Sequence, residues 1–321
     1  MSKAAKIHFD DTKGKFVASY AGHLLASSKS KEAVINLIVE GRCNKAKKFG
    51  VTSVEGNQQE IAADAVSEKF DINTRFGFTT DLVNMVVSKT VPSVIITGEG
   101  GLGKTHTVKK ALSDAKLVDC QSLFSNLDDL EEGESRAFSA TRPGDYTIVK
   151  GFSTPKGLYR TLYENRDKIV VFDDCDSVLR DPVALNLLKS ALDSYDERWI
   201  SWNSEGFVDD GLPRSFKFTG QIIFISNMPQ YKIDQAIKSR SILVDLSMTT
   251  DQKIERMSHI LEQDDFLPKF SVAYKREALA FLDKNRSVAK EISLRTLQTV
   301  TKVRATSKNW EQLAEYVLMN A

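Results

Sequence analysis

The run GEGGLGKT at residues 98–105 is the most informative stretch of this chain. It matches the pattern G-x-x-x-x-G-K-[ST] at every fixed position. The apolar run SVIIT at residues 93–97 precedes it, and a helical pattern begins near His106. The sequence therefore predicts a buried strand, a glycine-rich turn and a helix in succession, which is the context that a phosphate-binding loop requires.

Each part of this loop has a predicted role in binding a nucleotide. Its glycines let successive backbone N–H groups face a phosphate, and the helix N-terminus adds a partial positive charge. We expect Lys104 to reach the β- and γ-phosphates and the Thr105 hydroxyl to ligate Mg²⁺. The predicted nucleotide-binding residues are Gly98, Glu99, Gly100, Gly101, Leu102, Gly103, Lys104, Thr105 and His106.

A second apolar run, IVVF at residues 169–172, ends in the carboxylates Asp173 and Asp174. This is a Walker B pattern, and a parallel strand would deliver both carboxylates to the sheet edge where ligands bind. We expect Asp173 to hold Mg²⁺ directly or through water, and Asp174 to orient and polarise the attacking water. Together with the loop, the pair predicts ATP hydrolysis.

The composition is that of an ordinary soluble globular protein, with 41% hydrophobic and 27% charged residues among 321. This length favours two or three structural units. The net charge of +1 gives no whole-molecule argument for nucleic acid or membrane binding. No apolar run approaches the roughly 20 residues that span a bilayer. The three cysteines are odd in number and widely spaced, which favours free thiols in a reducing cytoplasm.

The hydrophobic pattern predicts an α/β protein with a P-loop core, a mainly parallel sheet covered on both faces, and a helical C-terminal lid. The expected organisation is a small ββ(β)α recruitment domain over 1–50, a linker and helix over 51–70, an α/β nucleotide-binding domain over 71–248 and an all-α lid over 249–321. The small domain should hold strands at 7–9, 16–20 and 24–26 and a helix from Ser30, and a further helix should cover 61–70. The expected core strands are 93–97, 146–149, 169–172, 222–225 and 242–244, and the expected core helices are 81–88, 107–115, 157–164 and 183–192. An acidic surface loop should occupy 121–145, and the expected lid helices are 251–263, 272–284, 293–306 and 310–319.

Three later features sharpen the class. The apolar strand at 222–225 ends in Ser226-Asn227, a short helix ends in Ser239-Arg240, and Arg295 lies at the start of a lid helix. With the two Walker motifs, these residues resemble the AAA+ ATPases over about residues 70–321. The resemblance implies that Asn227 acts as sensor 1 between the two Walker strands, Arg240 as a clamp-loader-like arginine finger, and Arg295 as sensor 2.

The same resemblance implies that the site is shared between subunits. Arg240 would lie far from its own loop and reach the γ-phosphate of a neighbour, so hydrolysis would require a homo-oligomer, usually a hexameric ring. Arg295 would act in cis and couple hydrolysis to lid rotation. The catalytic set is then Lys104, Asp174, Asn227, Arg240 and Arg295, with ATP and Mg²⁺ as cofactors. Ile72 and residues 75–78 either form the adenine pocket or pack in the core.

Two departures bear on the substrate. Asp173-Asp174 replaces the Asp-Glu of most AAA+ proteins, which implies either slower hydrolysis or a feature common to one subfamily. Asp-Asp and a strand ending in Ser-Asn also occur in superfamily-three viral helicases, which place a β-hairpin before that strand. Residues 198–218 have two β-prone arms there, so they either contact nucleic acid or pack on their own domain. The loop 150–156, with Phe152 between lysines, either lines a pore or packs inside.

We therefore expect a ring-forming ATPase that drives DNA replication, recombination or packaging and resembles the stand-alone AAA+ ATPases of phages. Its expected location is the cytoplasm, which is that of the host if a phage encodes it. One alternative is a protein remodeller or unfoldase, in which the N-terminal domain recruits a protein and Phe152 drags it. Another is a slow assembly scaffold controlled by ATP. The substrate and the size of the ring stay open at this point.

Overall fold

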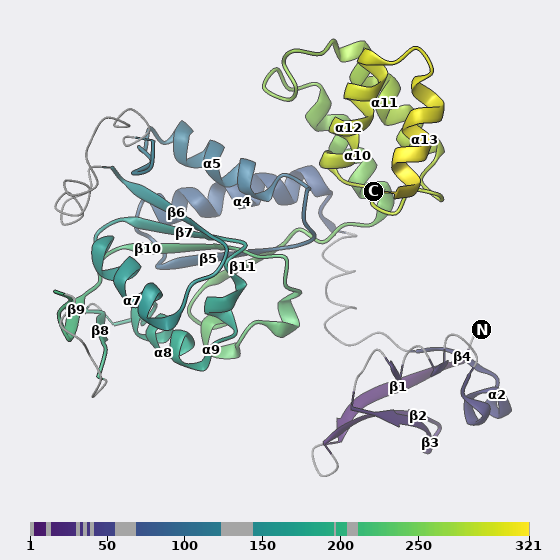
Figure 1. The fold of residues 1–321 in the computed structure, drawn as a ribbon. Coiled ribbons are helices and arrows are strands. Elements are labelled where there is room, and N and C mark those ends of the chain that lie inside the picture. Colours follow the sequence, from purple (N-terminus) through teal and green to yellow (C-terminus); the bar gives the residue numbers. More distant parts are fainter. Residues whose placement is uncertain are drawn as a thin grey trace. The chain divides into compact units, whose positions relative to one another are not determined.

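The computed structural model describes residues 3–10, 14–29, 33–34, 37–38, 42–54, 69–122, 144–195, 197–203 and 211–320. The chain divides into two compact units, Met1–Lys69 and Phe70–Ala321. Figure 1 labels their helices and strands.

The first unit contains a four-stranded sheet in the order β3-β2-β1-β4. The β1–β2 and β2–β3 pairs are antiparallel, whereas β4 runs parallel to β1. Ala21 and Gly22 join β2 to β3 with positive φ at both residues, as a type I′ hairpin turn requires. The elements are β1 (Lys3–Asp10), β2 (Lys15–Tyr20), β3 (His23–Ser28), α2 (Asn44–Phe49) and β4 (Val51–Val54).

Strand β4 lies in residues that the sequence pattern assigns to a linker. It pairs with β1, and Val51 is buried in the core of the unit. The residues Val-Thr-Ser-Val do not alternate between apolar and polar side chains, so the pattern gives no sign of this strand and the predicted boundary at residue 50 cuts through the sheet. Of the helix expected from Ser30, residues 33–34 and 37–38 are helical. Its start, the helix expected over 61–68 and most of the acidic loop, at 123–143, lie outside the described residues.

The second unit has a five-stranded sheet in the order β11-β5-β10-β7-β6, and every pair in it is parallel. The predicted α/β fold is confirmed, with β10 between the strands that carry the two Walker motifs. The strands are β5 (Ser93–Thr97), β6 (Tyr146–Lys150), β7 (Ile169–Asp173), β10 (Gln221–Ile225) and β11 (Ile242–Asp245).

Alternate residues of these buried strands pack on opposite faces of the sheet. Val171 and Ile223 join the core under α4 and α5, whereas Phe172 and Phe224 join the core under α7 and α8 (Figure 1). The covering helices are α4 (Ile72–Val87), α5 (Lys104–Asp114), α7 (Pro155–Glu164), α8 (Pro182–Ala191) and the short α9 (Gln235–Lys238).

Helix α4 begins nine residues before the predicted start at Asp81. Asp71 caps it by accepting a hydrogen bond of 2.9 Å from the Thr74 N–H. The polar first turn hides this start from the hydrophobic pattern. Arg75, which is buried, donates to the Asp245 and Ser247 carbonyls instead of facing solvent.

The lid is all helical, and its helices closely follow the predicted ranges. Thr249 and Gln252 form a capping box at its first helix. A separate core that includes Met257, Leu282 and Leu297 holds the lid together. The helices are α10 (Thr250–Leu261), α11 (Val272–Lys284), α12 (Leu294–Thr306) and α13 (Trp310–Asn320).

Candidate functional site

The glycine-rich loop joins β5 to α5 at the carboxyl edge of the sheet. Gly98, Gly101 and Gly103 all have left-handed φ values, which glycine adopts without strain. At Gly98 an added Cβ would also lie 2.9 Å from the Leu246 carbonyl carbon, and at Gly101 it would lie 3.1 Å from Ser293 Cβ. The loop therefore needs glycine at these two positions for space as well as for conformation.

Lys104 is buried and turns back into the loop. Its Nζ donates to the carbonyls of Gly98 at 2.6 Å and Glu99 at 2.7 Å and to Asn227 Oδ1 at 2.8 Å. Burial lowers the pKa of Lys104, and the nearby carboxylates, Asp174 first, oppose that shift. The ammonium thus joins the loop to the end of β10.

Asp173, at the end of β7, uses both of its oxygens. Oδ1 accepts a hydrogen bond of 2.8 Å from the Thr105 hydroxyl. Oδ2 lies 3.2 Å from Lys150 Nζ, which comes from the end of the neighbouring strand β6. The hydroxyl and carboxylate that the two Walker motifs supply are therefore in direct contact.

Asp174 adopts a left-handed backbone with φ +53°, which is uncommon for residues other than glycine. Its Oδ1 accepts a hydrogen bond of 2.8 Å from Asn227 Nδ2. Burial, followed by the charge of Asp173, raises the pKa of Asp174, whereas Lys104 and Arg295 oppose the rise. Chains of contacts thus run from the loop through Lys104 and Asn227 to this carboxyl group.

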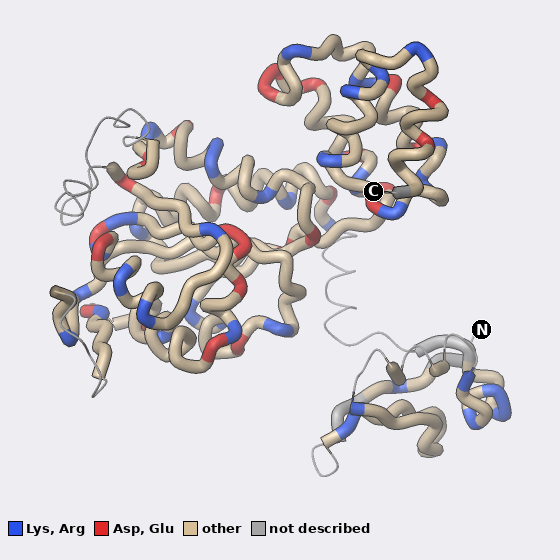
Figure 2. The backbone as a smooth tube through the Cα atoms, in the orientation of Figure 1, with Lys and Arg blue, Asp and Glu red and all other residues tan. Residues whose placement is uncertain are grey.

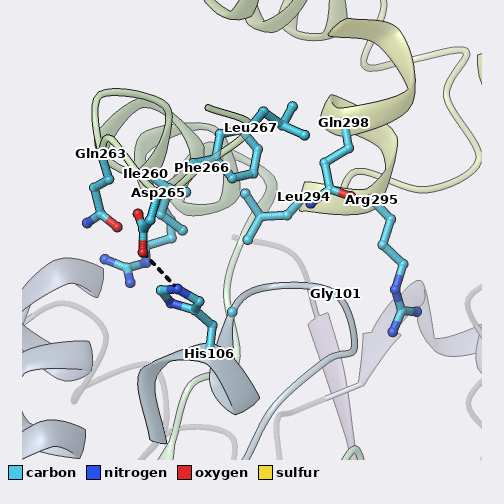
Figure 3. Close-up of a pocket in the computed structure, with 12 residues that line it drawn as sticks. Gly101, His106, Ile260, Gln263, Asp265, Phe266, Leu267, Leu294, Arg295 and Gln298 are labelled. Atoms are coloured by element: carbon cyan, nitrogen blue, oxygen red, sulfur yellow. Dashed lines mark hydrogen bonds and ion pairs between the residues drawn. The ribbon is translucent and has the colours of Figure 1, made fainter. Parts of the chain in front are cut away.

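A cavity of about 170 Å³ opens at this point. It is bounded by the loop, Asp174, Asn227 and Arg295. Arg295 comes from the first turn of α12 in the lid, and Figure 3 shows its side chain extending toward the core beside the Gly101 loop. The Leu294 N–H donates to the Gly101 carbonyl at 2.8 Å, so the lid contacts the loop directly.

Two further cavities adjoin α5. One, of about 300 Å³, lies between the loop and the lid, and at its mouth His106 Nε2 lies 3.0 Å from Asp265 Oδ2 (Figure 3). The other, of about 270 Å³, is lined by Phe76 and Gly77. Arg256 lines both cavities, with its guanidinium 3.8 Å from the centre of the Phe76 ring. Burial lowers the pKa of Arg256 to about 10.

Only some of the residues expected to surround an adenine line one of these cavities. Phe76 and Gly77 line a cavity, whereas Ile72 and Arg75 are buried in the core and Phe78 lies edge-on to Phe70. Sequence reasoning missed the contribution of the lid, namely Arg256, Ile260, Gln263, Asp265 and Leu294. No motif marks these residues, although the amphipathic pattern near 251–263 locates α10, which carries Arg256 and Ile260.

Arg240 does not approach the loop of its own chain. It follows α9, is half-buried, and donates through Nη1 to the Ala236 carbonyl at 3.0 Å. It is absent from the lining of the three cavities described above. Its Nε is buried without a hydrogen-bond partner among the described residues.

The two candidate substrate loops differ in their packing. Phe152 is 80% exposed, so the alternative that it packs in the core is wrong. In the hairpin, β8 (Trp199–Ser201) pairs antiparallel with β9 (Ser215–Lys217), and Ile200 and Phe216 are buried against the core. Trp199 stays 54% exposed, and residues 204–210 lie outside the described chain.

The described residues contain no group of three or more histidines, cysteines, aspartates or glutamates arranged to hold a metal ion. The three cysteines are buried and free. None of the described helices combines the length and the apolar character needed to cross a membrane.

Comparisons with known proteins give one sequence relative and several distant folds. No family model matches. A protein of Enterobacteria phage T4, described as an uncharacterized 36.7 kDa protein in the nrdC-mobD intergenic region, is 28% identical over 274 residues, covering 80% of this chain and 77% of that protein.

Solved structures match at low scores. Drosophila ORC bound to DNA aligns with a TM-score of 0.41 and 14% identity over 75% of this chain and 59% of that one. C. elegans PCH-2 aligns with a TM-score of 0.36 and 15% identity over 78% of this chain and 66% of that one. The FIGL-1 AAA domain in complex with ADP aligns with a TM-score of 0.27 and 15% identity over 71% of this chain and 61% of that one. This chain thus spans about three fifths of the first of these structures, and the fold assignment rests on its own strand order.

The environment of Asp174 predicts a gain in stability when its charge is removed. Because its pKa is raised in the folded state, the stability it contributes is present below the unfolded pKa and is lost as pH rises through the folded pKa. We expect Asp174→Asn to raise the melting temperature at pH 7, and the gain to shrink toward pH 4. Asp167→Asn, at an exposed position, is the control. A lower melting temperature for Asp174→Asn at pH 7 would contradict this reading.

Proposed function

We propose that this chain binds and hydrolyses ATP in the manner of the AAA+ ATPases that its sequence resembles. One observation carries the proposal: Lys104, Asn227 and Asp174 form a hydrogen-bonded chain beneath the loop, while Thr105 bonds Asp173 beside it. Three separate motifs thus converge on one polar cavity at the carboxyl edge of a parallel sheet, where such sheets bind ligands.

The residues present fit a bound Mg²⁺ ion. Magnesium prefers oxygen ligands and is held by few protein groups together with phosphates. The Thr105 hydroxyl and the Asp173 carboxylate, 2.8 Å apart, supply such oxygens, and they would hold the ion. When bound, the ion neutralises charge on the phosphates.

The remaining side chains have roles that follow from their chemistry. Lys104 would exchange its carbonyl acceptors for phosphate oxygens. Asp174 would accept a hydrogen bond from the attacking water, and Asn227 would hold that water or the γ-phosphate. Arg295 would add positive charge from the lid, in cis, where negative charge develops. His106 and the lid cavity would receive the rest of the nucleotide.

Arg240 leads to the proposal of a shared site. Its absence from the lining of the three cavities described above and its Nε, which has no hydrogen-bond partner among the described residues, are compatible with donation to the nucleotide of a neighbouring subunit. A trans arginine stabilises charge on the transferring phosphoryl group. We therefore propose a homo-oligomer, a hexameric ring by resemblance, as the active form.

For the substrate, we propose DNA, in replication, recombination or packaging, with the exposed Trp199 and Phe152 as contacts. The phage T4 relative supports a phage origin and hence a host-cytoplasm location. A remodeller that pulls polypeptide through Phe152, or a slow scaffold, is the alternative outcome. Stimulation of turnover by polypeptide but not DNA would select the remodeller, and ATP-dependent assembly with turnover near zero would select the scaffold.

One prediction of the proposed function concerns Lys104. Lys104→Ala removes the only described ammonium that reaches the loop carbonyls and Asn227, so nucleotide binding or turnover should fall to background. Fluorescent-nucleotide anisotropy and phosphate release measure the two effects. Lys109→Ala, at an exposed position of α5, is the matched control and should leave both unchanged. Full turnover in Lys104→Ala would refute the proposed site.

The trans arginine is tested by mixing variants. Arg240→Ala should retain nucleotide binding and lose hydrolysis, because its own site lacks only the neighbour's guanidinium. Mixing it with Asp174→Asn should restore part of the turnover, since the second variant supplies Arg240 to intact sites of the first. Lys238→Ala, on the same helix, controls for damage to α9. Hydrolysis by Arg240→Ala alone would remove the finger assignment.

Lys150 should compete with the metal for Asp173. Its ammonium lies 3.2 Å from Oδ2 and is 62% exposed, so the pair is weak and the effect modest. We expect Lys150→Met to lower the free Mg²⁺ concentration at half-maximal nucleotide binding by about two- to fivefold. Lys150→Arg should keep the wild-type midpoint, and Lys116→Met should not change it. An unchanged or higher midpoint in Lys150→Met would show that the two cations do not compete.

A further inference from the structure

Positive charge is concentrated in residues 1–54, the part of the first unit that forms its sheet and helix α2. Residues 1–54 contain ten lysines and arginines against four aspartates and glutamates, whereas residues 55–69 of the same unit contain one against four and residues 70–321 contain 33 against 35. The near-neutral total therefore combines a basic sheet-and-helix segment with a slightly acidic remainder. Figure 2 shows lysines and arginines along the described part of this unit. Such asymmetry favours a polyanionic partner for the basic part.

Helix α2 carries the densest group of these cations. Lys45, Lys47 and Lys48 are exposed, and Ala46 is the residue that the helix buries. Successive helical positions lie about 100° apart, so Lys48 points almost directly away from the buried Ala46. Lys45 and Lys47 lie on either side of it, and Lys45 is the one beside Phe49. The helix ends at Gly50, whose left-handed φ of +67° turns the chain directly into β4. Three ammonium groups are thus presented within two helical turns of a rigid element.

An aromatic pair adjoins this helix. The His23 ring stacks on Phe49 with centroids 4.9 Å apart and planes 19° apart, and Tyr20 lies 6.4 Å from Phe49. His23 is exposed at the start of β3, and its neighbour Leu24 is 49% exposed. Flat rings therefore lie beside lysines at one corner of the unit.

We propose that the α2 face, defined here as the exposed surface around this helix (Lys45, Lys47, Lys48 and Phe49) together with the adjoining His23, binds single-stranded DNA. Ammonium groups pair with backbone phosphates, and an unstacked base packs on the exposed histidine ring. A duplex keeps its bases stacked and cannot use that ring, and an acidic protein would not require it. The inference deepens the proposed DNA function by naming the part of the chain that holds the strand. It rests on that proposed function for its biological role, whereas the binding itself can be tested separately.

The test uses the full chain without nucleotide and a fluorescein-labelled oligo-dT, with binding followed by anisotropy across a salt series. Each lysine–phosphate contact on a single strand contributes about 0.7 to the slope of log K against log salt. Replacing all three lysines (Lys45→Ala, Lys47→Ala, Lys48→Ala) should reduce that slope by about 2 and weaken binding at least tenfold at low salt. His23→Ala should weaken binding about fivefold or more with the slope unchanged. The matched control replaces Lys284, Lys302 and Lys308, which are exposed in the second unit, and should stay within twofold of wild type.

Several results would overturn the proposal: no binding by the wild-type chain, equal loss in the control triple, tighter binding to a duplex of the same length, or equally effective competition by polyglutamate. Thermal melts establish that each variant is folded. Phosphate release measured on the same samples separates this inference from the proposed function. The variant with all three α2 lysines replaced should keep basal ATPase activity while losing DNA binding. A wild-type chain that binds DNA without hydrolysing ATP would support the α2 face as a DNA-binding surface and refute the proposed ATPase activity.

Discussion

The buried ammonium of Lys104 is the interaction on which the phosphate loop depends. Removing an ammonium ion from water costs several kcal/mol unless the protein supplies close partners. Here two loop carbonyls and the Asn227 amide oxygen lie within 2.8 Å, and Asp173 and Asp174 add their field. The same contacts hold the loop closed around the lysine. In the proposed nucleotide-bound state, phosphate oxygens would replace the loop carbonyls as acceptors for this ammonium.

The sheet makes this arrangement possible by bringing three chain segments to one edge. In the parallel register, Ile225 of β10 lies opposite Ile96 of β5 on one side and Asp173 of β7 on the other. Asn227 follows two residues later and can bond to Lys104 and to Asp174 at once. Inserting β10 between the Walker strands is therefore what turns two separate motifs into one polar network.

How far the sequence predicts this molecule depends on the range of the interaction. The loop, the strand ends and the lid helices could be predicted from the sequence, because glycine spacing and apolar periodicity are properties of contiguous residues. Strand β4 and the first turn of α4 could not be predicted in this way. Strand β4 forms by pairing with β1, which is distant in the sequence. The first turn of α4 contains a buried arginine, Arg75, which local patterns would place in solvent. The His106–Asp265 contact, between residues 159 positions apart, needs the lid docked on the core.

The docking of the lid also constrains how chemistry and motion can be coupled. The first turn of α12 rests on the loop: the Leu294 N–H donates to the Gly101 carbonyl, and Ser293 Cβ lies 3.1 Å from where a Cβ on Gly101 would be. Arg295 follows on the same turn and already influences the pKa of Asp174. A rotation of the lid must then break the loop contact and move the arginine in a single step, because one rigid helix end carries both. In the proposed ATPase, the lid would therefore need no flexible relay between the phosphates and its own helices.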